Sequence, residues 1–115
     1  MNELIESIFS GFTVNGVAIP VAYMMYNGHG QPFVTYQQID ADNALSGDDE
    51  LLGYADYYDF DVFSKGNYTA ICTAVRQRLE ANGFRWLPSK SSGDLYEDDT
   101  GYYHKTMCFG ILRED

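Results

Sequence analysis

Apolar residues near the start of the chain recur with the period of a helix. Leu4, Ile5, Ile8 and Phe9 would share one face of such a helix. Gly11 follows directly and is suited to end it. The pattern therefore predicts a short N-terminal helix.

A second and longer helix is predicted from about Asn67 to Asn82. Its apolar stripe recurs at i, i+4 and i+8 and consists of Ile71, Val75 and Leu79. Asn67 is a good N-cap because its side chain accepts from the free N–H groups of the first turn. Asn82-Gly83 offers a left-handed C-terminal stop.

Strand patterns occupy most of the remaining apolar sequence. They cover Val17–Tyr26, Pro32–Ile39, Tyr54–Phe63, Phe84–Leu87 and Tyr102–Leu112. Asn27-Gly28-His29-Gly30 tolerates positive φ, so the first two strands are expected to form a hairpin. Neither face of Tyr54–Phe63 is purely apolar, which places it beside solvent or a partner. The order of elements predicts an α+β fold, with a mainly antiparallel sheet of about four to five strands and two helices packed on one face.

Two polar stretches separate these elements. Asp40–Gly53 contains five acids and two glycines, and we interpret it as a flexible acidic loop. Ser89–Gly101 is also polar and is expected to be a loop. A length of 115 residues fits one domain, so residues 1–115 are assigned to a single α+β domain.

The charge of the chain is unevenly distributed along the sequence. Seven bases and seventeen acids give a net charge of −10, and no Lys or Arg precedes Lys65. This composition argues against specific binding of nucleic acid, which depends on clustered bases. Three interpretations remain: a solvated acidic face, two unlike surfaces that join copies head to tail into a ring, or an acidic mimic of nucleic acid.

The sequence offers no convincing catalytic, cofactor or metal site. A zinc site needs about four N or S ligands, and His29, His104, Cys72 and Cys108 show no paired spacing. His104 together with Asp98 or Asp99 would suggest acid–base chemistry. We prefer a histidine held by loop backbone. The two cysteines are expected to be free and reduced. No apolar run approaches the roughly 18 residues of a membrane span, so no membrane partner is expected.

Aromatic residues are abundant, with ten Tyr and seven Phe. Tyrosine is enriched at protein interfaces because it combines a large contact area with a polar tip. We therefore predict an interface made of tyrosines and of carboxylates from the acidic loop. Its residues are Tyr54, Tyr57, Tyr58, Tyr102, Tyr103, Asp48, Asp49 and Glu50.

The layout resembles the tail-terminator, or tail-completion, proteins of long-tailed bacteriophages and prophages. The resemblance covers nearly the whole chain and is carried by a sequence of patterns. An N-terminal helix precedes an apolar strand, followed by Pro32-Phe33-Val34-Thr35-Tyr36. An aromatic strand then ends in Ser64-Lys65-Gly66, a helix ends in Leu79-Glu80-Ala81-Asn82-Gly83-Phe84, and the acidic segment Tyr96–Thr100 enters a Tyr-rich strand.

The resemblance implies a structural role without an active site or cofactor. Such proteins form rings, often hexamers, between the tail-tube protein and the head–tail connector. The implied location is the host cytoplasm during assembly and afterwards the virion tail. The alternatives are another head–tail joining or minor tail component, an acidic nucleic-acid-mimic inhibitor, or a small enzyme.

Overall fold

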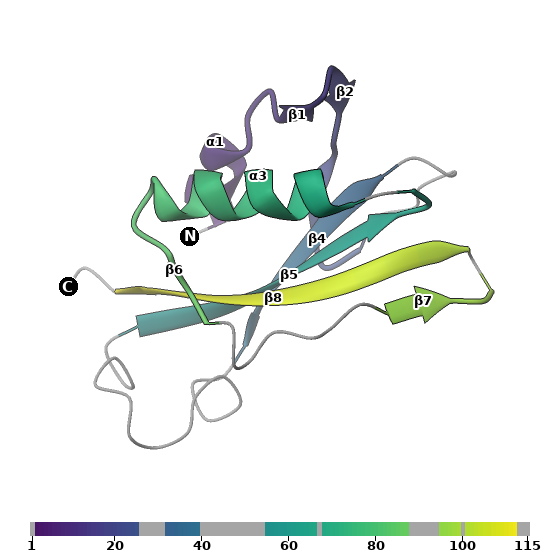
Figure 1. The fold of residues 1–115 in the computed structure, drawn as a ribbon. Coiled ribbons are helices and arrows are strands. Elements are labelled where there is room, and N and C mark those ends of the chain that lie inside the picture. The colour runs from purple at the N-terminus through teal and green to yellow at the C-terminus, as the bar shows by residue number, and fades with distance from the viewer. Residues whose placement is uncertain are drawn as a thin grey trace.

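Both helices of the described residues lie on the same side of a twisted sheet (Figure 1). The computed structural model describes residues 2–25, 32–39, 55–66, 68–87, 95–99 and 101–112. In chain order the elements are α1 (Asn2–Ile8), β1 (Thr13–Val14), β2 (Val17–Ala18), β3 (Val21–Tyr23), β4 (Phe33–Ile39), β5 (Ala55–Ser64), α3 (Thr69–Glu80), β6 (Arg85–Trp86), β7 (Leu95–Glu97) and β8 (Tyr102–Leu112). The predicted α+β class is confirmed. The predicted acidic loop Asp40–Gly53 lies outside the described residues.

The main sheet is built around the long antiparallel pair β5 and β8. Its order within the described ranges is β3-β4-β5-β8-β6, and β7 also pairs with β8. The β5–β8 register runs from Ala55 opposite Leu112 to Ser64 opposite Tyr103. Among the described strand pairs, β3–β4 is the only parallel one. The sheet is therefore mainly antiparallel, as predicted, but it has six described strands where four to five were expected.

The additional strand is β7, which falls inside the predicted loop Ser89–Gly101. It pairs with the start of β8, with Leu95 opposite His104. The turn between them closes where the Gly101 N–H donates to the Glu97 carbonyl at 2.8 Å, and Gly101 adopts a φ of +76°. Positive φ favours glycine at this position. The strand has only three residues and lies beside acidic and glycine positions, so its sequence pattern was too weak to predict it.

The predicted strand Val17–Tyr26 is wrong, because the chain divides it at Pro20. Its first part, β2, pairs with β1 across the Asn15-Gly16 turn, where both residues have positive φ. Pro20 has no N–H for a sheet, and its carbonyl instead accepts from the Val34 N–H. The second part, β3, joins the main sheet.

The predicted hairpin between this region and β4 is also wrong. β3 runs parallel to β4, with Val21 opposite Val34 and Tyr23 opposite Tyr36. The strand ends at Tyr23, and the next residue, Met24, adopts a φ of 66°. That left-handed conformation turns the backbone out of the strand direction. The turn residues Asn27–Gly30 lie outside the described residues.

The main core lies between the helices and the sheet. α3 buries its predicted stripe of Ile71, Val75 and Leu79, and α1 buries Ile5 and Ile8. Phe60 is fully buried among the rings of Phe9, Tyr36, Phe84 and Phe109. The predicted C-terminal stop of α3 is confirmed by Gly83, whose φ is +91°. Asn67 is not described, and Tyr68 precedes the helix without a side-chain capping bond.

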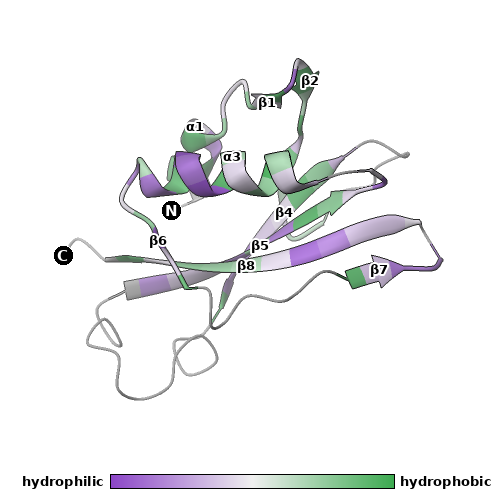
Figure 2. Ribbon diagram, viewed as in Figure 1, coloured by the Kyte–Doolittle hydropathy of each residue, from purple (hydrophilic) through white to green (hydrophobic). Residues whose placement is uncertain are grey.

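Alternation along β5 divides its side chains between the two faces of the sheet. Tyr58, Phe60 and Val62 belong to the helix-side core, whereas Asp59 and Asp61 occupy the opposite face. Figure 2 shows a related change along β8, which is hydrophilic near β7 and hydrophobic toward its C-terminal end. The face away from the helices therefore carries polar groups in its central rows.

Candidate interaction surfaces

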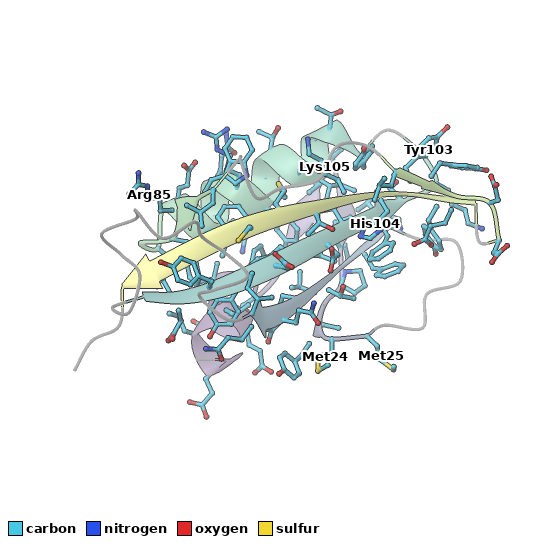
Figure 3. All side chains as sticks on the ribbon, turned by 90° about the horizontal axis from the view of Figure 1, so that it is seen from below. Met24, Met25, Arg85, Tyr103, His104 and Lys105 are labelled. Atoms are coloured by element: carbon cyan, nitrogen blue, oxygen red, sulfur yellow. The ribbon has the colours of Figure 1, made fainter. Side chains whose placement is uncertain are left out.

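Three consecutive large apolar side chains are exposed at the β3 end of the sheet. The exposed fractions are 48% for Tyr23, 60% for Met24 and 73% for Met25. Figure 3 shows Met24 and Met25 at one edge of the molecule. We call Val21, Tyr23, Met24 and Met25 the β3 edge.

Among the described strands, β3 is paired on one side only, and the Tyr23 carbonyl accepts from the Met25 N–H at 2.8 Å. Pro20 and Met24 make backbone bonds to Val34 and Tyr36 of β4. Because alternate residues of a strand direct their backbone groups to opposite sides, Val21 and Tyr23 direct theirs away from β4. An open edge with apolar side chains is a template for pairing with another chain.

Acidic groups lie on the same side of the molecule as the β3 edge. The Tyr23 ring contacts the Tyr36 ring at a centroid distance of 5.5 Å. Burial raises the pKa of Tyr36, and the negative charge of Glu6 on α1 raises it further. Glu3 and Glu6 are both exposed. The β3 edge is therefore an apolar surface next to negative charge.

A groove of about 160 Å³ lies at the opposite edge of the sheet, between α3 and the strands β6 and β8. We call it the α3–β8 groove. Its polar and aromatic lining includes Tyr68, Thr69, Thr73, Arg76, Trp86 and Lys105. The guanidinium carbon of Arg76 lies 4.2 Å from the centre of the Trp86 ring. A groove with cations, hydroxyls and an aromatic wall is suited to an anionic chain segment.

Aromatic rings extend this groove toward β7. Tyr68 also borders a second hollow together with Lys65 and Tyr103. Tyr103 stacks on Tyr68 with ring planes 13° apart, and it contacts Tyr96 at a centroid distance of 4.9 Å. Tyr96 and Tyr103 are 55% and 42% exposed. In Figure 3, Tyr103 and Lys105 lie across the sheet from Met24 and Met25.

Three of the five basic residues of the described ranges lie at the groove or its extension. Lys65, Arg76 and Lys105 line the groove or its extension. Arg78 instead ties α3 to the N-terminal segment, because its Nη1 donates to the carbonyls of Ile8 at 2.7 Å and Ser10 at 3.2 Å. Bases from the second half of the chain thus give the groove side of the described surface its positive charge.

His104 lies on the face away from the helices, between two carboxylates. Its Nε2 is 3.1 Å from Asp61 Oδ1, and its Nδ1 is 3.6 Å from Glu97 Oε2. The ring stacks on Phe63 at a centroid distance of 4.2 Å. The acid–base pairing considered from the sequence was with Asp98 or Asp99, but the described contacts are with Asp61 and Glu97.

The hydroxyl beside His104 is not arranged as a nucleophile. Thr106 Oγ1 lies 3.4 Å from His104 Nε2, but it donates its proton to Asp61 Oδ1. A histidine that activates a hydroxyl accepts that proton itself. The arrangement therefore ties β5, β7 and β8 together through side-chain contacts.

Asp59 is a carboxyl group on the face away from the helices, and burial perturbs it. Burial raises its pKa, the nearby Asp61 raises it further, and a hydrogen bond with Cys108 opposes these effects. On the helix side, burial and the charge of Asp56 raise the pKa of Tyr58 to about 12. Both groups are perturbed mainly by burial, and neither lines the α3–β8 groove.

Of the four predicted interface tyrosines that the structure describes, only Tyr103 is exposed. Tyr57 and Tyr58 are each 1% exposed and Tyr102 is 6% exposed, so their rings fill the interior of the isolated chain. Tyr103 is exposed and borders the extension of the groove. Tyr54, Asp48, Asp49 and Glu50 lie outside the described residues. Tyr103 is therefore the described tyrosine that is still available for the predicted interface.

Sequence reasoning did not single out the lining of the groove or the β3 edge. The signal for the groove was the restriction of all bases to the second half of the chain. For the edge, the signal was Tyr23-Met24-Met25 just after a proline. The two cysteines do not form a disulfide; Cys108 is buried and Cys72 is partly buried.

Among the described residues, no three His, Cys, Asp or Glu side chains are grouped to hold a metal ion. No described helix is long and apolar enough to cross a membrane. Comparison of the sequence with protein-family models and with curated proteins finds no match.

Proposed function

We propose that this chain is a structural protein that assembles head to tail with copies of itself, as a tail-terminator or tail-completion protein of a bacteriophage or prophage does. The observation that carries the proposal is the presence of two unlike surfaces at opposite edges of one sheet. One is the apolar β3 edge, and the other is the basic, aromatic α3–β8 groove.

Unlike surfaces favour a particular kind of assembly. A contact between two different patches leaves each copy with one patch of each kind still available. Such contacts close into a ring when the rotation between copies allows it, and otherwise produce a filament. The overall charge of −10 opposes close approach of copies. Local bases in the groove reduce that repulsion where contact is needed.

The surroundings of His104 support a structural role over catalysis. The hydroxyl of Thr106 is bonded to Asp61, and His104 is packed on Phe63. These contacts stabilise three neighbouring strands. The proposal accordingly assigns the chain no enzymatic activity and no cofactor.

The resemblance supplies the finer part of the proposal. A ring of this chain, with six copies as the expected number, would lie between the tail-tube protein and the head–tail connector. It would be made in the host cytoplasm and end in the virion tail. The groove and the β3 edge would form contacts within the ring, leaving the ring faces for the tube and the connector.

Light scattering over a wide range of concentration tests the proposal. The expected result is a mass that rises from 13.0 kDa to a ring-sized multiple, with closed rings in electron micrographs. A monomer at every concentration would contradict self-assembly of the isolated chain. It would favour an adaptor or a nucleic-acid mimic. A pull-down from infected or lysogenic cells would distinguish these two alternatives by the partner that each captures.

A further inference from the structure

We propose that the α3–β8 groove binds the acidic segment Asp48–Leu52 of a second copy of this chain. The inference rests on the proposed head-to-tail assembly and names both sides of one contact. The groove belongs to one copy and the segment, with sequence Asp-Asp-Glu-Leu-Leu, belongs to its neighbour.

The groove provides positive charge that is only partly neutralised. Arg76 Nε lies 3.0 Å from Glu80 Oε1, and both side chains are 44% exposed. Arginine has five N–H donors, so this contact leaves others for a second carboxylate. Within the described part of the chain, no carboxylate lies within 4.0 Å of the Lys105 ammonium. The two cations therefore provide donors for more than one carboxylate.

Aromatic and hydroxyl groups extend the recognition beyond charge. Trp86 and Met107 line the groove, as do the hydroxyl-bearing Thr69 and Thr73. Trp86 offers apolar area to aliphatic side chains, and the hydroxyls can donate to carboxylates or backbone carbonyls. A fitting occupant combines acids with large apolar residues over a few positions.

The chain itself contains such a segment. Asp48, Asp49 and Glu50 form its first run of three adjacent acids, and Leu51 and Leu52 follow directly. No Lys or Arg precedes Lys65, so Asp48, Asp49 and Glu50 have no base nearby in sequence. Charge complementarity therefore matches the segment of one copy to the groove of another.

A nucleic acid is a poorer occupant than this segment. A long polyphosphate would extend beyond three local cations and meet the field of a chain with net charge −10. A short acidic peptide satisfies the groove without that repulsion. The choice between these two anions is part of the test.

Trp86 is the single tryptophan of the chain and lines the groove, so its fluorescence reports occupancy. The probe is a synthetic peptide of residues 45–54, added to the full-length protein and excited where tyrosine absorbs little. The expected result is a saturable change in Trp86 emission that weakens with added salt. Calorimetric titration provides a second reading of the same affinity.

Matched variants assign the binding to the groove. Removing both cations in R76Q/K105Q should weaken peptide binding at least about tenfold, while circular dichroism shows that the fold is retained. R85Q removes an exposed base that is not part of the lining and should bind as the wild type does. Equal binding by wild type and R76Q/K105Q would overturn the proposal.

The peptide controls test the occupant. A peptide with Asp48→Asn, Asp49→Asn and Glu50→Gln should give no saturable response. Equal binding of this neutral peptide, or stronger binding of an oligothymidylate of equal charge, would overturn the assignment to the acidic segment.

Light scattering on the same samples separates this inference from the proposed function. Assembly of the wild type without peptide binding would overturn the groove contact while leaving self-assembly in place. Peptide binding by a chain that stays monomeric would overturn both the ring-forming role and the contact with a second copy, and would leave the groove as a site for another acidic partner.

Discussion

The guanidinium carbon of Arg76 lies 4.2 Å from the centre of the Trp86 ring, and this contact joins α3 to β6 across one wall of the groove. The Arg76 side chain is also held by Glu80, one helical turn further along α3. Two partners thus fix a long side chain that would otherwise move freely. The groove therefore presents its positive charge at a defined position.

Replacing Arg76 by Ala should expose the Trp86 ring and weaken the link between α3 and β6. An exposed cation–π contact contributes about 0.5–1 kcal/mol, so the free energy of unfolding should fall by about that amount. Acrylamide quenching of Trp86 should increase. Urea denaturation and quenching measure the two effects.

Arg76→Lys provides the matched control for that prediction. Lysine keeps the charge but lacks the planar group that stacks on an aromatic ring. Quenching in this variant should lie between the wild type and Arg76→Ala. Identical quenching in all three proteins would show that the contact does not shield Trp86.

Phe60 occupies the centre of the core and should be the most costly aromatic residue to truncate. It is fully buried and lies in contact with rings from the N-terminal segment, β4, β8 and the residue just before β6. Phe60→Ala should destabilise the fold by about 3–5 kcal/mol, a large part of the stability of a small domain.

Phe60→Leu tests whether that loss comes from the cavity. Leucine retains most of the volume, so this variant should lose clearly less stability than Phe60→Ala. Denaturant unfolding followed by circular dichroism compares them. Equal losses would point to ring contacts rather than to the cavity.

The core and the central strands were the parts most readily predicted from sequence. Ile71, Val75 and Leu79 mark one face of α3, and the alternation in β5 separates Phe60 from Asp61. These patterns are local, because they reflect which side of one element meets the core. They predicted the α+β class without information on how distant segments pair.

The edges of the sheet and the groove depend on distant contacts, and they were not predicted. A short strand such as β3 carries no signal for its direction, and Asn27–Gly30 suggested a hairpin where the pairing is parallel. Arg76, Trp86 and Lys105 come from three elements, and no spacing in the sequence links them. Their proximity follows only from the packing of α3 over the β6–β8 edge.

Gly110 is needed because the Tyr57 ring crosses the backbone of β8. A Cβ at Gly110 would lie 2.9 Å from Tyr57 Cε1 and 3.1 Å from Cδ1. Tyr57 is only 1% exposed, so its ring has little room to move. Gly110→Ala should therefore cost about 1–3 kcal/mol, as overpacking does. Thermal unfolding measures the loss.

Gly66→Ala is the matched control, because a Cβ there meets nothing within 4 Å and its φ is not in the left-handed region. This variant should keep the wild-type stability within about 0.5 kcal/mol. If Gly110→Ala is equally neutral, the Tyr57 ring adjusts and the close contact does not restrict the site.

Asp59 should make the stability of the fold depend on pH. Burial and Asp61 raise its pKa in the folded chain, so the folded state binds the proton more tightly than the unfolded state. This contribution to stability is present at low pH and is lost as the pH rises through the folded-state pKa. Asp59→Asn should therefore raise stability at neutral pH relative to the wild type.

Urea denaturation at several pH values measures this effect. The difference between Asp59→Asn and wild type should shrink toward acidic pH, where the wild-type carboxyl is protonated. Asp98→Asn changes an exposed carboxyl and serves as the control. A constant difference between Asp59→Asn and wild type across the pH range would contradict the ionisation argument.

The β3 edge provides the last prediction, because it can be altered without disturbing the core. Tyr23→Lys/Met25→Lys places charge on two exposed positions of this edge, so the free energy of unfolding should change by less than about 1 kcal/mol. Self-association measured by light scattering should weaken at least tenfold, because two ammonium groups would have to be desolvated at the contact. The substitutions also reduce the net negative charge, which by itself would favour association. Val17→Lys is the control, since Val17 is 50% exposed on β2 and is not part of the β3 edge. If both variants associate as the wild type does, the β3 edge is not a contact between copies.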